Sequence, residues 1–196
     1  MNGEILSVRT KEKNESLVVL EIFSEGEKIK YTVNEGTYRE IGCPLSGECI
    51  DSEALAALSE DDGRRRALAK AASLLSFADN SEKNLKMKLT RAGFSAEHAE
   101  FATEECVRLG YIDEARQIEH VITKCHEKLI GPHKIIAKLI SRGYSAKRAF
   151  RIMRELEERG AIDFDAAKKK LIKEKLAADA SREDKQKLLH RYGYLK

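Results

Sequence analysis

The sequence predicts a mainly α-helical protein, in which tandem three-helix repeats follow a small antiparallel β N-terminal module. Residues Lys88–Asp113 and Lys138–Asp163 share the skeleton K-L-x-x-x-G-[FY]-S-A followed by G-x-I-D, with identical internal spacing. The apolar pattern also changes along the chain, from near-alternation to a helical period of about 3.6 residues after Arg64. A repeated segment of this length is typical of supersecondary units that gain stability by packing on their neighbours.

The N-terminal 62 residues predict a small three-stranded meander. Its strands are rich in β-branched residues and are joined by polar turns at Lys11–Ser16 and Ser24–Glu27. We expect strands over Glu4–Thr10, Leu17–Phe23 and Lys28–Val33, then short helices over Asn34–Ile41 and from Asp51. The acidic stretch Glu60–Gly63 predicts the boundary of this module.

Helix caps and glycines define the repeats. Ser95 and Ser145 are predicted N-caps, and the glycine pairs Gly93/Gly143 and Gly110/Gly160 are predicted helix stops, all separated by 50 residues. The predicted repeats are 63–111, 112–161 and a truncated third repeat, 162–196. Their long helices are expected over Arg64–Phe77, Glu114–Leu129 and Phe164–Ala178, with no strand after Asp51.

Charge is distributed unevenly. Residues 1–60 hold 6 Lys/Arg and 12 Asp/Glu, a net charge of −6, whereas the rest of the chain holds 30 and 21, a net charge of +9. An acidic head on a basic body indicates two modules, of which the second faces an anionic partner.

Several classes of function lack sequence support. The chain has no GxxxxGK[ST], GxSxG or HExxH motif, and its five histidines are scattered over predicted solvent-facing positions, so we expect neither an enzyme nor a cofactor. The four cysteines form no CxxC pair and are expected to be reduced thiols; a zinc site using Cys43, Cys49 and a distant histidine is the alternative. No apolar run has signal-peptide or membrane-span length, which predicts a soluble, cytoplasmic protein.

Residues 64–194 resemble a known family. The motif residues are Leu74-Leu75, Ser81, Leu85, Leu89 and Gly93-Phe94, then Gly110-Tyr111-Ile112-Asp113-Glu114, then Gly131-Pro132 to Ile135. This pattern resembles that of the RecX family, regulators of the bacterial RecA recombinase. The agreement in spacing extends over two full repeats.

The resemblance implies a non-enzymatic inhibitor of RecA in recombination, DNA repair and the SOS response. Family members lie in the groove of RecA–DNA filaments, bridge successive subunits, and lower ATP hydrolysis and strand exchange. Some also bind DNA. The partner implied here is therefore a RecA filament on single-stranded DNA, and we expect the chain itself to be a monomer.

A basic window provides the candidate binding surface. From Lys128 to Arg154 the chain contains eight basic residues and no Asp or Glu. The residues predicted to contact the partner are Lys134, Lys138, Arg142, Lys147, Arg148 and Arg151. We expect their side chains on the solvent side of two consecutive helices, where they form one patch suited to phosphates or to an acidic protein groove.

Other interpretations stay open at this point. The window is alternatively an ordinary solvated helix face, and Lys168–Lys175 is a second basic run. The turn aromatics Phe94, Tyr111, Tyr144 and Tyr194 are expected to anchor helix ends, and stacking on bases is the alternative. The rival function is a nucleic-acid-binding helical repeat protein without a filament partner.

Overall fold

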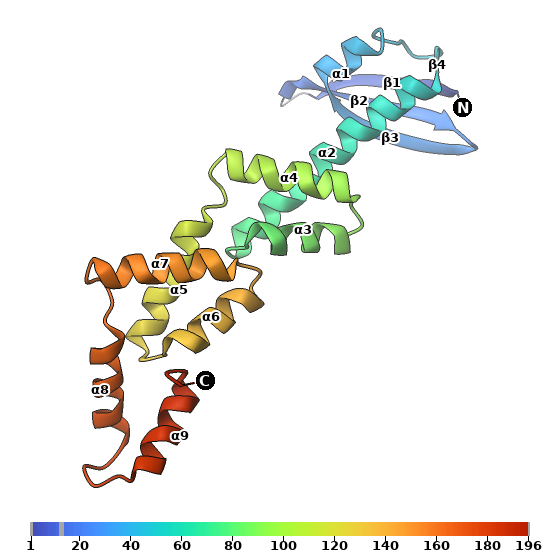
Figure 1. Cartoon of the computed structure of the whole chain (residues 1–196). Helices are drawn as coiled ribbons and strands as arrows, with labels where there is room; N and C mark the ends of the chain where they lie inside the picture. The colour runs from blue at the N-terminus through green and yellow to red at the C-terminus, as the bar shows by residue number, and fades with distance from the viewer. Residues whose placement is uncertain (1, 12–13, 196) are drawn as a thin grey trace. The chain divides into compact units, whose positions relative to one another are not determined.

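The computed structural model describes residues 2–11 and 14–195. It forms two compact units, each made of two stretches of the chain: Met1–Ser73 with Lys88–Cys106, and Leu74–Met87 with Val107–Lys196. The predicted fold class is confirmed, because helices dominate the chain after a small antiparallel sheet (Figure 1). The four-part division at residues 62, 111 and 161 stays a prediction.

Among the described residues the sheet has four strands in the order β3-β2-β1-β4, where three were predicted. They are β1 Gly3–Lys11, β2 Asn14–Ser24, β3 Glu27–Asn34 and β4 Cys49–Ile50. The unpredicted β4 is only two residues long and pairs with Gly3 and Glu4 at the start of β1. The predicted turn in Lys11–Ser16 falls partly on residues 12–13, which lie outside the described residues. Glu25 and Gly26, both with positive φ, form the tight β2–β3 turn.

Helix α1 spans Glu35–Glu40 and follows β3 directly, as predicted. The next helix, α2, runs without interruption over Ser52–Phe77, so the short helix predicted from Asp51 and the long helix predicted over Arg64–Phe77 are in fact one helix. The carboxylates of this stretch have tertiary partners in β3: Asp61 accepts the Asn34 N–H at 2.6 Å, and Asp62 accepts the Thr32 N–H at 3.1 Å.

Gly63 lies inside α2 and does not end the helix. The absence of a side chain at this position leaves room for a neighbouring residue. The imidazole ring of His98 lies against Gly63, closer than a Cβ atom there would permit. Glycine costs a helix interior about 1 kcal/mol relative to alanine. The close approach of His98 explains why a glycine stands at this position.

Seven further helices follow in the described chain. They are α3 Glu82–Arg91, α4 Ala96–Arg108, α5 Glu114–Glu127, α6 Pro132–Ser141, α7 Ala146–Glu158, α8 Phe164–Lys175 and α9 Arg182–Tyr192. The starts of α5 and α8 agree with the predicted starts, and both helices end two to three residues earlier than predicted. No strand follows Asp51 in the described part of the chain, as expected.

The predicted start and stop residues behave as their chemistry requires. The side chains of Asp113, Asp163 and Ser181 each accept a backbone N–H from the first turn of the following helix. Ser145 occupies the N-cap position of α7 but its side chain makes no capping bond. The turn glycines Gly93, Gly110, Gly143, Gly160 and Gly193 all have positive φ.

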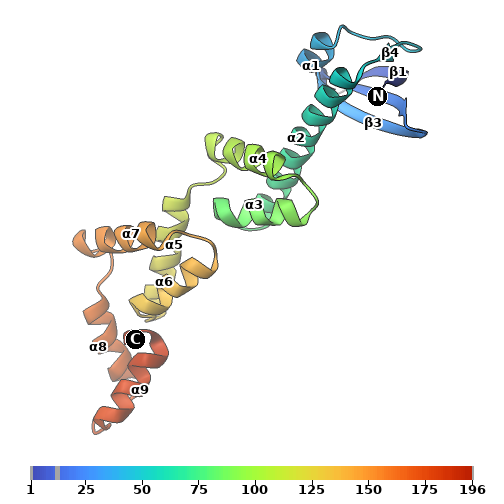
Figure 2. The same ribbon diagram turned by 45° about the vertical axis from the view of Figure 1, so that its right-hand side comes forward.

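The core of the second unit lies mainly between α5, α6 and α7, which contact one another in pairs (Figure 2). Its fully buried side chains include Ile118, Ile122, Ile135, Leu139 and Leu156. The α8–α9 pair adds a smaller cluster around Leu171, Leu188 and Leu189. Over residues 2–11 and 14–195, no helix has the length and apolar character to cross a membrane.

Candidate partner-binding surface

Helix α7 separates an apolar side from a basic side. Ala149, Ile152, Met153 and Leu156 are buried against the core. On the opposite side lie four exposed residues that we call the α7 face: Lys147, Phe150, Arg151 and Arg154. Their spacing of three, one and three residues places them on adjacent turns of one helix surface.

Phe150 is the functional candidate that the sequence analysis missed. Its side chain is 55% exposed, although a phenylalanine of a small helical unit is ordinarily buried. The signal was present in the sequence, because Phe150 falls outside the apolar stripe that Ala149, Ile152, Met153 and Leu156 define. An exposed aromatic surrounded by three cations is a typical anchor of a binding surface.

An open groove of about 980 Å³ runs along α7. Its lining residues are Glu114, Pro132, Ser145, Lys147, Arg148, Phe150, Arg151, Met153, Arg154 and Glu157. The whole α7 face therefore borders this groove. Of the six predicted contact residues, the structure brings Lys147, Arg148 and Arg151 together here, whereas Lys134, Lys138 and Arg142 are not among its lining residues.

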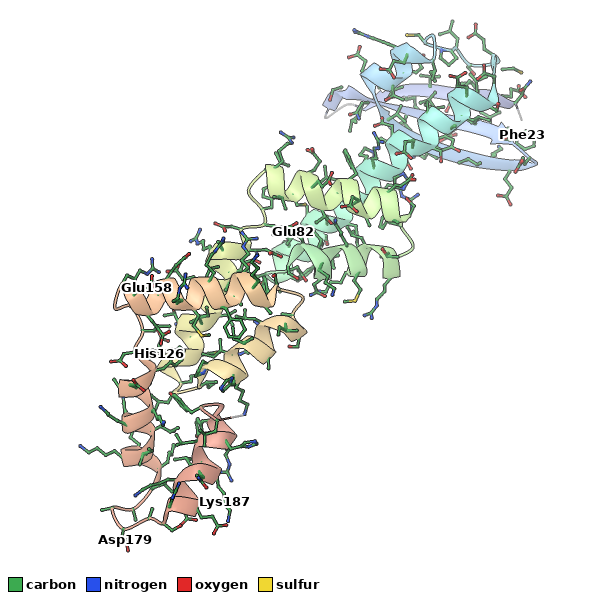
Figure 3. All side chains as sticks on the ribbon, viewed as in Figure 1. Phe23, Glu82, His126, Glu158, Asp179 and Lys187 are labelled. Atoms are coloured by element: carbon green, nitrogen blue, oxygen red, sulfur yellow. The ribbon has the colours of Figure 1, made fainter. Side chains whose placement is uncertain are left out.

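Arg148 lies only partly on the solvent side, because 36% of its side chain is exposed and the rest packs against neighbouring residues. Its Nη1 donates to Glu114 Oε2 at 3.1 Å, and its Nε is buried without a partner among the described residues. The other oxygen of Glu114 accepts the Glu82 N–H at 3.1 Å, at the first residue of α3 (Figure 3). Glu114 thus joins α7 to the start of α3.

The predicted basic residues in and just after α6 contact other parts of the second unit. The ammonium group of Lys134 donates to the carbonyl oxygen of Arg191, in the last turn of α9, at 3.0 Å. The Lys138 ammonium lies 3.6 Å from Cys125 Sγ. The Arg142 carbonyl accepts from the Ser81 hydroxyl at 2.7 Å, while its side chain is exposed. These partners are neutral groups, so the three side chains keep their positive charge, and the bonds of Lys134 and Lys138 hold their ammonium groups against the protein.

Carboxylates just after the basic window form ion pairs with two of the cations of the α7 face. Arg151 lies 3.6 Å from Glu155, and Arg154 lies 3.3 Å from Glu158, each one helical turn further along. Figure 3 shows Glu158 near the C-terminal end of α7. Exposed pairs of this kind contribute about 0.5 kcal/mol. An anionic partner therefore displaces them at little cost, and no carboxylate in the described chain pairs with Lys147 in this way.

The turn aromatics divide into two groups. Tyr144 is buried and its hydroxyl donates to Gln117 Oε1 at 2.9 Å, which fits the predicted anchoring role; burial raises its pKa. Tyr194 packs edge-to-face on Phe164, with ring centroids 6.4 Å apart. Tyr111 differs from the expectation, because it is 59% exposed.

Two histidines also differ from the predicted solvent-facing positions. His98 Nε2 lies 2.9 Å from Glu60 Oε2, and the His126 ring packs on Phe164 (Figure 3). All four cysteines are free thiols; Cys43 and Cys49 are exposed, and Cys106 and Cys125 are buried. Within residues 2–11 and 14–195, no three His, Cys, Asp or Glu residues gather as metal ligands do.

Together these features define a class of protein: a helical repeat protein with a basic, aromatic-centred surface on one exposed helix. No protein-family model matches the chain. A curated relative from Pelodictyon phaeoclathratiforme, named "Regulatory protein RecX", is 30% identical over 126 residues, which are 64% of this chain and 78% of the relative.

A solved structure shares the fold of this chain. A crystal structure of "regulatory protein RecX" superposes with a TM-score of 0.68 at 17% identity, covering 97% of this chain and 92% of the other. A crystal structure of "RecX from Lactobacillus salivarius" covers 68% of this chain and 99% of the other, with a TM-score of 0.47 and 12% identity. The identity and coverage of the curated relative place the chain in the RecX family.

Proposed function

We propose that this chain is a non-enzymatic modulator, specifically an inhibitor, of the RecA recombinase. In this proposal it binds in the groove of RecA–DNA filaments as a monomer in the cytoplasm, and lowers ATP hydrolysis and strand exchange. Membership of the RecX family supports the choice of partner. The observation that carries the proposal is the α7 face, where Phe150 is exposed among three cations beside an open groove.

We propose a different set of direct contact residues from the six that were predicted. We propose that Lys147 and Arg151, joined by Phe150 and Arg154, contact the filament. Arg148 holds α7 in place through Glu114 and therefore positions the face. Lys134 and Lys138 lie on α6, and Arg142 directly follows it. All three contribute to the surrounding positive field, which favours association with an anionic surface and weakens as salt rises.

A second function remains a candidate because of one observation. An exposed aromatic among cations also suits single-stranded nucleic acid, where bases stack on the ring and phosphates contact the charges. In that case the chain binds DNA without any filament partner.

Co-sedimentation distinguishes the two functions. The protein is centrifuged with RecA–single-stranded DNA filaments and, separately, with the same DNA alone, over a series of NaCl concentrations. We expect co-sedimentation with filaments to persist at salt concentrations that abolish binding to the bare DNA, because protein contacts add to the charge contacts. Equal binding to both, with the same salt dependence, contradicts the filament proposal and supports the DNA-binding alternative.

A further inference from the structure

The outer edge of β3 is divided into a closed half and an open half. β3 is an edge strand, since the sheet order is β3-β2-β1-β4 (Figure 1). A two-residue turn joins β2 to β3 and pairs Ser24 with Glu27. From that register, Lys28, Lys30, Thr32 and Asn34 direct their backbone N–H and C=O groups away from β2.

Helix α2 closes the C-terminal half of this edge. Asp62 accepts the Thr32 N–H, the Arg65 Nε donates to the Thr32 carbonyl at 2.8 Å, and Asp61 accepts the Asn34 N–H. The outward backbone groups of Lys28 and Lys30 have no such bond within the described chain. Two residues of β3 therefore present the donors and acceptors to which another strand adds.

A crevice of about 350 Å³ lies beside the open half. Ile29 and Tyr31 line it from the inner face of β3, and Phe94 lines it from the turn before α4. Ile29 is 36% exposed here, although its cross-strand partner Ile22 is fully buried. The crevice thus offers a partly apolar site on the side of the sheet that faces α2.

The open half of the edge carries two lysines, and Glu25 and Glu27 are exposed at the adjoining turn. Lys28 and Lys30 are exposed and point to the outer face, and no described carboxylate lies within ion-pair distance of either ammonium group. Glu21, the cross-strand neighbour of Lys30, is paired with Arg9 at 3.0 Å. Arg66 and Asp62 both line the crevice. The Asp62 carboxylate forms ion pairs with two guanidinium groups, those of Arg65 and Arg66.

We propose that the Lys28–Lys30 edge binds an extended acidic segment of a partner protein by strand addition. The segment alternates acidic and apolar residues: the acidic side chains lie beside Lys28 and Lys30, and the apolar ones enter the crevice next to Ile29 and Tyr31. The lysines disfavour pairing with a second copy of the same edge, because like charges would then lie opposite one another. This site is separate from the α7 face and does not depend on the proposed function.

A designed peptide tests the proposal with the full-length protein. The probe is a fluorescein-labelled peptide of alternating glutamate and valine, measured by fluorescence anisotropy. Two further probes carry N-methyl groups on either all glutamates or all valines, which removes the backbone donors from one edge of the peptide at a time. We expect one methylated probe to lose at least tenfold in affinity and the other to bind as the parent does. Equal binding of both methylated probes contradicts strand addition.

Protein variants make the same test from the other side. Lys30→Pro removes the outward N–H of residue 30. The proline is tolerated there because this N–H makes no hydrogen bond to β2, so the β2–β3 bonds are kept. Lys30→Ala, which keeps the N–H, is the matched control. We expect Lys30→Pro to abolish binding and Lys30→Ala to weaken it severalfold, with unchanged circular dichroism. If the proline also perturbs the sheet, amide hydrogen exchange of the parent protein provides the test instead. We then expect the bound peptide to slow exchange of the Lys28 and Lys30 amides.

Three further outcomes overturn the proposal: no binding of the acidic peptide at millimolar concentration, binding without protection of those two amides, or self-association of the chain through this edge.

Discussion

At the scale of single residues, Gly63 shows how a position in a helix is set by a distant side chain. The His98 ring lies against it, bonded to Glu60 on the preceding turn of α2. We predict that Gly63→Ala lowers the free energy of unfolding by about 1 to 3 kcal/mol, although alanine is the better helix former, because the ring must move and lose its bond. Urea denaturation measures the change.

The chain offers a matched control for this substitution. Gly36 lies in α1, and no neighbouring atom lies within 4 Å of the position that a Cβ would occupy there, so Gly36→Ala is expected to be neutral or stabilising. Adding His98→Ala to Gly63→Ala should recover part of the loss. A Gly63→Ala protein as stable as the parent contradicts the packing role.

Glu60 predicts a response to acid. The hydrogen bond from His98 is the main cause that lowers the pKa of Glu60 from its ordinary value of 4.5. A carboxyl with a lowered folded-state pKa contributes stability above pH 4.5 that is lost as pH falls through the lowered value. We therefore predict that the Glu60→Gln protein loses less stability than the parent between pH 4.5 and pH 3, measured by urea denaturation. If the free energy of unfolding falls equally with pH in both proteins, the stabilising role of the Glu60–His98 bond is contradicted.

Tyr194 predicts the opposite dependence at high pH. Burial raises its pKa from 10.0 to about 12, and its hydroxyl is buried without a partner among the described residues. Because the folded-state pKa is raised, the phenol does not change stability with pH below pH 10, and the folded state loses stability relative to the unfolded state as pH rises from 10 toward 12. In an absorbance titration at the tyrosinate band, Tyr194→Phe should remove a late-titrating component near pH 12.

The same substitution has an expected effect on stability at neutral pH. A buried hydroxyl without a partner contributes nothing favourable, so Tyr194→Phe should leave the free energy of unfolding unchanged or raise it by about 1 kcal/mol. A loss greater than 1 kcal/mol would show that the hydroxyl has a partner.

At the scale of elements, one contact recurs at a spacing of 50 residues. The turn after α6 lies on the start of α3, where Ser81 Oγ donates to the Arg142 carbonyl. The turn after α9 lies on the start of α6, where the Gly131 N–H donates to the Tyr192 carbonyl at 2.7 Å. A turn glycine makes room in both cases, Gly143 against Ser81 and Gly193 against Lys134. Successive repeats are thus joined by the same geometry.

This contact predicts different costs for two similar glycines. Gly160 and Gly193 both have positive φ, but only Gly193 has close neighbours: a Cβ there would lie 2.8 Å from the Lys134 nitrogen. We predict that Gly160→Ala costs about 1 kcal/mol of conformational strain, whereas Gly193→Ala costs more and releases α9. Amide hydrogen exchange over Arg182–Tyr192 measures the release. Equal costs, with α9 still protected, would contradict the contact.

Local chemistry made these elements predictable from sequence. The caps Asp113 and Asp163 and the turn glycines act through neighbouring backbone groups, so sequence spacing alone located them. The continuous α2 was missed because its acidic residues bind β3, 27 to 30 residues away. The partial burial of Arg148 was not predicted for the same reason, since Glu114 lies 34 residues from it. The exposure of Phe150, in contrast, could have been predicted from the helical pattern of α7 but was overlooked.

At the scale of the whole molecule, the positive charge on the helical repeats and the exposed α7 face form the basis of the proposed function. Reversal of Arg148 would not test that face, because it would leave Glu114 beside a second carboxylate. Lys147, Arg151 and Arg154 are exposed, so reversing them to glutamate should cost little folding energy. Lys169, Lys173 and Lys175 on α8 are also exposed and provide a control with the same change in net charge.

The most direct measurement is the rate of DNA-dependent ATP hydrolysis by RecA at increasing concentrations of this protein. We predict that the parent protein and the Lys169/Lys173/Lys175→Glu variant lower the rate, and that the Lys147/Arg151/Arg154→Glu variant, with unchanged helicity, loses at least tenfold in potency. An unchanged ATPase rate at saturating parent protein would contradict the proposed inhibition. Full potency of the α7 variant would show that this face is not the contact surface.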